Sequence, residues 1–81
     1  MYVEVFTGPS CPYCHPTVET IRKLAPDAQV TEISVADEKG QYRAKSMGVM
    51  CLPTIVVNGK VVSRGKPSDE KLKKLLNTTK E

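Results

Sequence analysis

Two cysteines separated by two residues, Cys11 and Cys14, constrain this chain more than any other feature because of what surrounds them. Residues 2–7 are β-branched and aromatic, which predicts a strand, and the Gly8-Pro9 pair ends it. From residue 11 to residue 25, apolar side chains recur at helical spacing. The cysteine pair is therefore expected to open a helix directly after a strand and a turn.

This position favours redox chemistry. A thiol at a helix N-terminus faces unpaired backbone N–H groups and the positive end of the helix dipole, and both stabilise the nucleophilic thiolate. Cys11 stands at the helix end, where we expect it to be exposed, and Cys14 lies one turn deeper on the apolar face. This geometry predicts that Cys11 attacks a substrate disulfide and that Cys14 then attacks the Cys11 sulfur and releases the product.

The same helix contains two prolines. Pro12 suits the first helical position, where a missing N–H costs nothing. Pro16 would remove one backbone hydrogen bond, so we expect a kink or a loosened first turn there. Pro26 marks the end of the helix, because the residue before a proline avoids helical angles.

The rest of the chain alternates strands and helices. Residues 28–35 predict a second strand, residues 37–47 a short helix, residues 54–63 a β-hairpin, and the residues after Ser68 a last helix. The order β-α-β-α-β-β-α favours a right-handed parallel crossover between the first two strands and an antiparallel pair at the end. The predicted fold class is α/β, with a mixed four-stranded sheet flanked by helices.

Local signals set the ends of these elements. Asn58-Gly59 predicts the two-residue type I′ turn of the hairpin. Asp37 is a plausible N-cap of the short helix, and Gly48 a plausible C-terminal stop. Gly40 weakens this helix by up to ~1 kcal/mol relative to alanine.

The length limits the chain to one domain, residues 1–81. A chain of 81 residues buries only about 60–65% of its unfolded surface, which leaves no room for a second domain or a deep enclosed cavity.

No apolar run reaches the roughly 18 residues of a membrane helix. Aromatic residues are few and the net charge is only +3, so nucleic acid is not an expected partner. We expect a monomer.

The cysteine count bears on the compartment. Three cysteines are an odd number, whereas a small secreted scaffold usually carries an even and larger set. Met1 is followed directly by the strand pattern, without the basic and apolar segments of a secretory signal. We therefore expect the reducing cytoplasm, although a mature periplasmic chain would have a similar sequence.

The cysteine pair is also compatible with bound haem. Residues 11–15 spell the C-x-x-C-H motif of covalent haem attachment, and Met47 or Met50 could supply the second axial ligand. However, the surroundings are rich in strands, and covalent haem needs an export route that this sequence gives no sign of using. His15 is better interpreted as a polar residue near the site that favours the Cys11 thiolate when protonated.

Zinc and an iron–sulfur cluster are further alternatives. Cys11, Cys14, Cys51 and His15 formally make a Cys3His set. Because Cys14 and His15 are adjacent, they would point in different directions on a helix. An iron–sulfur cluster would need ligands from a second chain or from external thiols. We expect no cofactor beyond the redox-active Cys11–Cys14 disulfide itself.

These motifs, taken together, resemble those of thioredoxin-fold oxidoreductases of glutaredoxin size over nearly the whole chain. The resemblance rests on Cys-Pro-Tyr-Cys at residues 11–14 after a strand, and on Leu-Pro-Thr at residues 52–54 before the hairpin strand. It continues in the Asn-Gly hairpin and in the turn at residues 65–68. The resemblance implies thiol–disulfide exchange through the cysteine pair.

It also implies a substrate-binding loop. Pro53 would follow a cis peptide bond beside the disulfide, which costs little before a proline, and the alternative is an ordinary proline at a strand start. The backbone of Leu52 would pair with an extended substrate segment. Pro12 and Tyr13 form the exposed rim of the motif, and Tyr13 is either a flat apolar substrate contact or simply an exposed helix residue.

The sequence combines features of two branches of this family. Cys-Pro-Tyr-Cys resembles glutaredoxins, whereas the turn from Gly65 to Ser68 resembles thioredoxins. The paired-glycine and acidic segment that glutaredoxins use for glutathione is not clearly present. The combination resembles small thioredoxins of archaea and some bacteria. We therefore expect protein disulfides as substrates and a flavoenzyme of the thioredoxin-reductase type as electron donor, with glutathione as the alternative.

Two positions depart from the thioredoxin pattern. Val5 stands where thioredoxins carry a buried Asp, so deprotonation of Cys14 must rely on another acceptor, either water or Glu4. Cys51, two residues before Pro53, fits neither branch. It is either a small buried hydrophobic residue or a third redox cysteine that traps or regulates the site.

Overall fold

The computed structural model describes residues 1–9, 11–65 and 67–78. Its elements follow the predicted order, with small shifts in their boundaries: β1 (Tyr2–Thr7), α1 (Cys14–Leu24), β2 (Gln29–Ser34), α2 (Glu38–Ser46), β3 (Thr54–Val57), β4 (Lys60–Arg64) and α3 (Asp69–Thr78). Within the described residues, no helix has the length and apolar character that crossing a bilayer requires.

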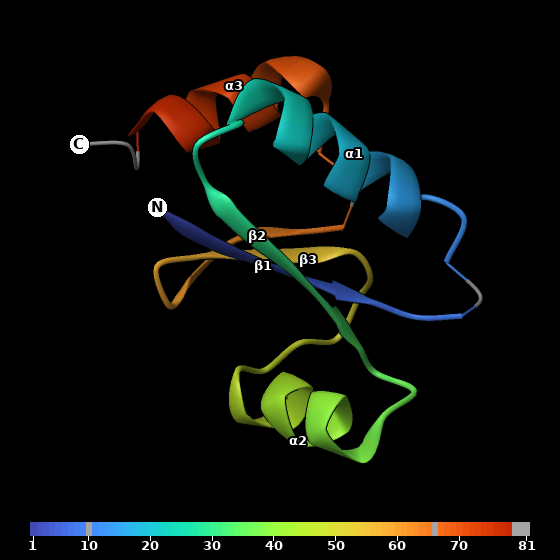
Figure 1. Cartoon of the computed structure of the whole chain (residues 1–81). Helices are drawn as coiled ribbons and strands as arrows, with labels where there is room; N and C mark the ends of the chain where they lie inside the picture. The colour runs from blue at the N-terminus through green and yellow to red at the C-terminus, as the bar shows by residue number, and fades with distance from the viewer. Residues whose placement is uncertain (10, 66, 79–81) are drawn as a thin grey trace.

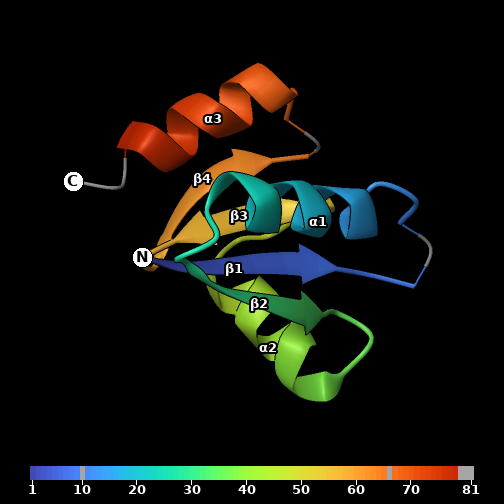
Figure 2. The ribbon, with the colours of Figure 1, turned by 45° about the horizontal axis from the view of Figure 1, so that its top comes forward.

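The strands form one mixed sheet in the order β2-β1-β3-β4. β1 pairs with β2 in parallel, with Val3 opposite Val30, and with β3 in antiparallel, with Val5 opposite Ile55. β3 and β4 form the antiparallel hairpin. Helices α1 and α3 cover one face of this sheet, and α2 covers the other (Figures 1 and 2). The predicted fold class is confirmed.

Two apolar layers hold the helices on the sheet. The alternation of side chains along β1 directs Val3 and Val5 to the α1 and α3 face and Phe6 to the α2 face. All three side chains are fully buried. The larger layer also contains apolar residues from α1, from α3 and from the residue that follows α1: Val18, Ile21, Ala25, Leu72 and Leu76.

The hairpin turn and the helix ends mostly follow their sequence signals. Asn58 and Gly59 both have positive φ angles, 51° and 85°, as a type I′ turn requires. Gly48, with φ 67°, ends α2. The Oγ of Ser68 accepts a hydrogen bond from the Lys71 N–H at 3.2 Å, which confirms it as a cap of α3. Asp37 is the N-cap of α2 but makes no side-chain capping hydrogen bond.

The predicted start of α1 is wrong. The helix begins at Cys14 with Tyr13 as its N-cap, so Pro12 lies in the preceding turn rather than at the first helical position. Pro16 is consequently the third residue of the helix, where a backbone N–H has no partner within the helix in any case. Pro16 therefore removes no helical hydrogen bond, and the reason for expecting a kink or a loosened turn there no longer applies. The first helical bond runs from the Thr17 N–H to the Tyr13 oxygen at 3.1 Å.

Gly40 is not the weak point that its helix propensity suggests. It lies buried in α2 where the helix approaches the end of β2. A Cβ atom at this position would overlap the carbonyl group of Ser34. The absence of a side chain therefore lets α2 pack directly against the end of β2.

Candidate active site

Cys11 and Cys14 form a disulfide between the end of β1 and the start of α1, with their Cα atoms 5.6 Å apart. Cys11 lies in the turn, partly exposed, and its N–H donates a 3.3 Å hydrogen bond to the Gly8 carbonyl oxygen. Cys14 is the first residue of α1 and is only 3% exposed. The predicted difference in accessibility is confirmed, and Cys11 is the more accessible half of the disulfide.

The loop before β3 lies beside this disulfide. Its Leu52–Pro53 peptide bond is cis, as the resemblance implied. Pro53 is fully buried, and its carbonyl oxygen accepts a 2.8 Å hydrogen bond from the Gly65 N–H at the end of β4. The Thr54 hydroxyl donates a 2.6 Å hydrogen bond to the Cys51 carbonyl oxygen. The loop is therefore fixed to the sheet on both sides of the proline.

The disulfide and the loop share a shallow groove of about 450 Å³, which we call the cysteine groove. It brings together four of the six predicted site residues: Cys11, Pro12, Tyr13 and Leu52. The other two do not line it, because the side chains of Cys14 and Pro53 are buried. The remaining lining residues are Gly8, Pro9, Val35, Met50 and Cys51.

Sequence reasoning missed Met50 and Val35 as groove residues. Val35 follows β2 just as Gly8 follows β1, and the carboxyl ends of neighbouring parallel strands meet at one edge of a sheet, where ligands commonly bind. That rule could have placed Val35 in the groove. Met50 is 91% exposed and had been considered only as a haem ligand. Its closeness to Pro53 in the sequence was the available signal.

Cys51 is exposed and is a free thiol. The interpretation of Cys51 as a small buried hydrophobic residue is therefore wrong. It lines the cysteine groove together with Cys11, so a partner bound at the disulfide would also pass over Cys51.

The structure does not assemble the formal zinc ligands. His15 is exposed, and its Nε2 atom lies 3.4 Å from Glu19 Oε1, one turn along α1, whereas the adjacent Cys14 is buried. The two side chains diverge, as predicted. Among residues 1–9, 11–65 and 67–78, no three His, Cys, Asp or Glu side chains come together as a metal site would need.

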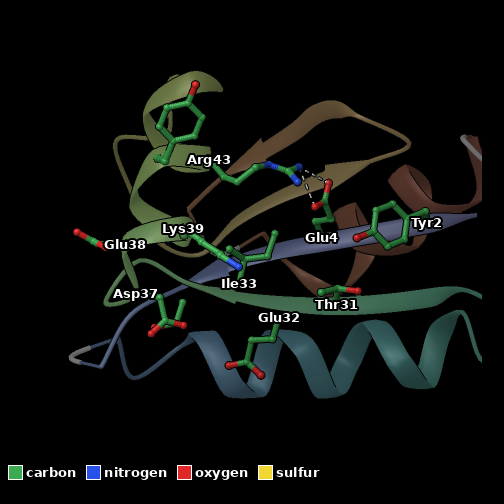
Figure 3. Close-up of a pocket in the computed structure, with 12 residues that line it drawn as sticks. Tyr2, Glu4, Thr31, Glu32, Ile33, Asp37, Glu38, Lys39 and Arg43 are labelled. Atoms are coloured by element: carbon green, nitrogen blue, oxygen red, sulfur yellow. Dashed lines mark hydrogen bonds and ion pairs between the residues drawn. The ribbon is translucent and has the colours of Figure 1, made fainter.

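Glu4 lies on the wrong face of the sheet to serve Cys14. Its carboxylate, almost fully buried, accepts two hydrogen bonds from Arg43 Nη2 at 3.0 and 2.8 Å. Figure 3 shows Arg43 reaching from α2 to Glu4 on β1. Val5, the next residue of the strand, points instead into the layer under α1. The proposal that Glu4 accepts the Cys14 proton is therefore wrong.

The Glu4–Arg43 pair forms part of a wider hollow between α2 and strands β1 and β2 (Figure 3). This hollow measures about 830 Å³, and no cysteine is among the residues that line it. This wider hollow is thus separate from the sulfur chemistry.

A family model for the thioredoxin domain matches residues 1–77. The chain belongs to the thioredoxin family. The thioredoxin of Methanocaldococcus jannaschii is 38% identical over 73 residues, covering 86% of this chain and 85% of the relative. A probable thioredoxin of Methanothermobacter thermautotrophicus is 36% identical over 81 residues, covering 93% and 91%. These similarities support the thioredoxin branch over the glutaredoxin branch.

Solved structures agree. The crystal structure of the thioredoxin-like protein BC3987 has a TM-score of 0.73 and 32% identity, covering 91% of this chain and 99% of that one. A variant of the thioredoxin from Halobacterium salinarum has a TM-score of 0.77 and 26% identity, covering 99% and 74%. Family membership and the Cys11–Cys14 disulfide together make this protein a thiol–disulfide oxidoreductase.

Proposed function

We propose that this thioredoxin reduces disulfides in protein substrates, with Cys11 as the nucleophile and Cys14 as the resolving thiol. One observation carries the assignment: of the two cysteines of the disulfide, Cys11 lines an open groove and Cys14 is only 3% exposed. An attacking thiolate must reach a sulfur of the partner, and of these two cysteines Cys11 is the one placed to do so.

The reaction proceeds in two exchanges from the dithiol form. The Cys11 thiolate attacks one sulfur of the substrate disulfide, that bond breaks, and the second substrate sulfur leaves as a thiolate that takes a proton from water. Cys14 then loses its proton to water and attacks the Cys11 sulfur. This step breaks the mixed disulfide, releases the first substrate sulfur as a thiolate, and forms the Cys11–Cys14 disulfide. Two electrons have passed to the substrate.

We assign water as the proton acceptor for Cys14, because neither Val5 nor Glu4 can take that proton. Val5 is apolar and fully buried, and Glu4 is paired with Arg43 on the opposite face of the sheet. The N-terminus of α1, where Cys14 is the first residue, stabilises the thiolate that forms.

Substrate binding is assigned to the two sides of the cysteine groove. Tyr13, 53% exposed, and Pro12 supply an apolar rim next to Cys11. Leu52 lies on the opposite side, and its backbone pairs with an extended substrate segment as an added strand would. Pro53 does not touch the substrate in this assignment but supports Leu52, because Pro53 is buried and its carbonyl oxygen accepts a hydrogen bond from the Gly65 N–H.

We assign the protein to the cytoplasm, as a monomer without a cofactor beyond the Cys11–Cys14 disulfide. The electron donor that we assign is a flavoenzyme of the thioredoxin-reductase type. The support is the match to the thioredoxin family and to curated thioredoxins. The donor test compares that flavoenzyme plus NADPH with glutathione plus glutathione reductase, each at matched donor concentration, with insulin as the disulfide substrate. Faster turnover with the flavoenzyme supports the assignment, and faster turnover with glutathione overturns it.

A further inference from the structure

A second hollow adjoins the cysteine groove. It measures about 320 Å³ and shares with that groove Val35, Met50, Cys51 and Leu52. Its far side is formed by Gln41, Ala44 and Lys45 of α2 and by Val49. We call this second depression the α2 hollow. Because the two depressions share one wall, a segment that lies over Cys11 and passes across residues 50–52 enters the α2 hollow next.

The lining of the α2 hollow is apolar with a single charge. Val35, Val49 and Leu52 pack against the buried layer that contains Phe6, so the floor of the hollow is the edge of that layer. Lys45 is exposed at the rim. Among the described residues that line either depression, Lys45 is the only charged side chain. An apolar floor beside an isolated cation suits a segment that carries an apolar and an acidic side chain.

Two exposed apolar side chains lie along the same path. The described chain has four exposed large hydrophobic side chains, of which Tyr13 and Met50 line the cysteine groove. Met50 also lines the α2 hollow, and 91% of its surface is open to solvent. Exposed apolar groups beside a site are typical of surfaces that a partner covers.

We propose that protein substrates bind across both depressions, and that Met50 and Lys45 determine which disulfides are preferred. The substrate cysteine lies at Cys11, the substrate backbone crosses Leu52, an apolar side chain enters the α2 hollow beside Met50, and an acidic side chain pairs with Lys45. This proposal rests on the proposed function, because the α2 hollow is reached from the disulfide.

The test uses synthetic peptides with one cysteine, each joined to thionitrobenzoate as a mixed disulfide, and measures the release of the coloured thiol by the reduced protein. A leucine next to either glutamate or lysine is placed about two to five residues from the cysteine on each side, since an extended chain advances about 3.3 Å per residue. The small disulfide of cysteine with thionitrobenzoate reports reaction at Cys11 without the second depression.

The charge arm compares Lys45→Glu with Lys73→Glu, an exposed lysine on α3 that lines neither depression. At one spacing or more, the wild-type protein is expected to prefer the glutamate peptide to the lysine peptide by about threefold in kcat/KM, the effect of one exposed ion pair. Lys45→Glu reverses this preference, and Lys73→Glu keeps it. If no spacing shows a change specific to Lys45→Glu, the proposal is overturned.

The apolar arm compares Met50→Ser with Tyr42→Ser, which removes an exposed aromatic side chain from the other side of α2. Met50→Ser is expected to lower kcat/KM for the leucine peptides by about fivefold more than kcat/KM for the small disulfide. Equal losses on all substrates, or equal losses in both variants, overturn the proposal. Failure of the proposed function looks different: Cys11→Ser would then react with the peptides as fast as the wild-type protein.

Discussion

The Thr54 hydroxyl lies 2.6 Å from the carbonyl oxygen of Cys51, and the hydrogen bond between them spans the cis Leu52–Pro53 pair. Thr54 is fully buried at the start of β3, whereas Cys51 is exposed in the groove. The bond therefore connects the interior of the sheet to the wall of the active site. The position of Leu52 opposite Cys11 depends on it.

Replacing Thr54 with valine tests this connection. Thr54→Val keeps the shape of the side chain but removes the donor, and we expect the free energy of unfolding to fall by about 1–2 kcal/mol. We expect kcat/KM for a protein disulfide to fall severalfold, because residues 51 and 52 of the groove wall are no longer held by the hydrogen bond from Thr54. Thr20→Val is the matched control, since the Thr20 hydroxyl makes a similar bond to the Pro16 oxygen on α1. Equal activity losses in both variants would contradict the account.

Gly8 and Leu52 are packed so closely that a methyl group does not fit between them. A Cβ atom at residue 8 would lie 2.8 Å from Leu52 Cδ1. Because that atom is the end of a flexible side chain, Gly8→Ala is expected to cost no more than about 1 kcal/mol of stability. It should nevertheless raise KM for protein disulfides by displacing Leu52. Adding Leu52→Val should restore KM in part, and kinetics that stay normal in Gly8→Ala would show that Leu52 does not contact the substrate.

The Glu4–Arg43 pair is expected to stabilise the fold without taking part in catalysis. Arg43→Gln leaves a buried carboxylate without its cation, which should lower the free energy of unfolding by about 1–3 kcal/mol, limited by the solvent that reaches the half-exposed arginine side chain. Arg22→Gln, at an exposed position of α1, is the control. Disulfide reduction below the melting temperature should be unchanged. A loss of activity at unchanged stability would contradict this account, because it would show that the Glu4–Arg43 pair takes part in the reaction of the cysteines.

Gly40 gives a prediction whose sign is opposite to that of helix propensity. Propensity alone makes Gly40→Ala stabilising by up to about 1 kcal/mol. The structure makes it destabilising by about 2 kcal/mol or more, because the new Cβ atom would meet the backbone of Ser34 and α2 would have to move. Thermal unfolding decides between the two, and Gln41→Ala, at the exposed neighbouring position, controls for propensity.

The arrangement of the fold could be predicted from the sequence because each element carries its own local signal. The β-branched and aromatic residues 2–7 predicted the strand that became β1, whose side chains alternate between the two apolar layers. The Asn58-Gly59 pair set the hairpin turn, with its positive φ angles. These features depend on residues that are close together in the sequence, so they could be predicted without knowledge of the tertiary structure.

The errors arose where distant segments meet. Gly40 is needed because of the Ser34 carbonyl group, Glu4 is paired with an arginine from α2, and Cys51 is exposed because of how its loop lies beside the disulfide. No local pattern encodes these contacts. The start of α1 was misplaced for a different reason, since a proline is compatible with both the turn and the first helical turn.

The most direct test of the central claim is trapping of a substrate by Cys14→Ser. Without the resolving thiol, the protein should accumulate as a mixed disulfide with a protein substrate, and peptide mapping should place the bond on Cys11. The variants Cys11→Ser/Cys14→Ser and Cys51→Ser/Cys14→Ser separate the contributions of the two remaining thiols. The account predicts that trapping is lost in the first and kept in the second. Trapping through Cys51 in place of Cys11 would contradict it.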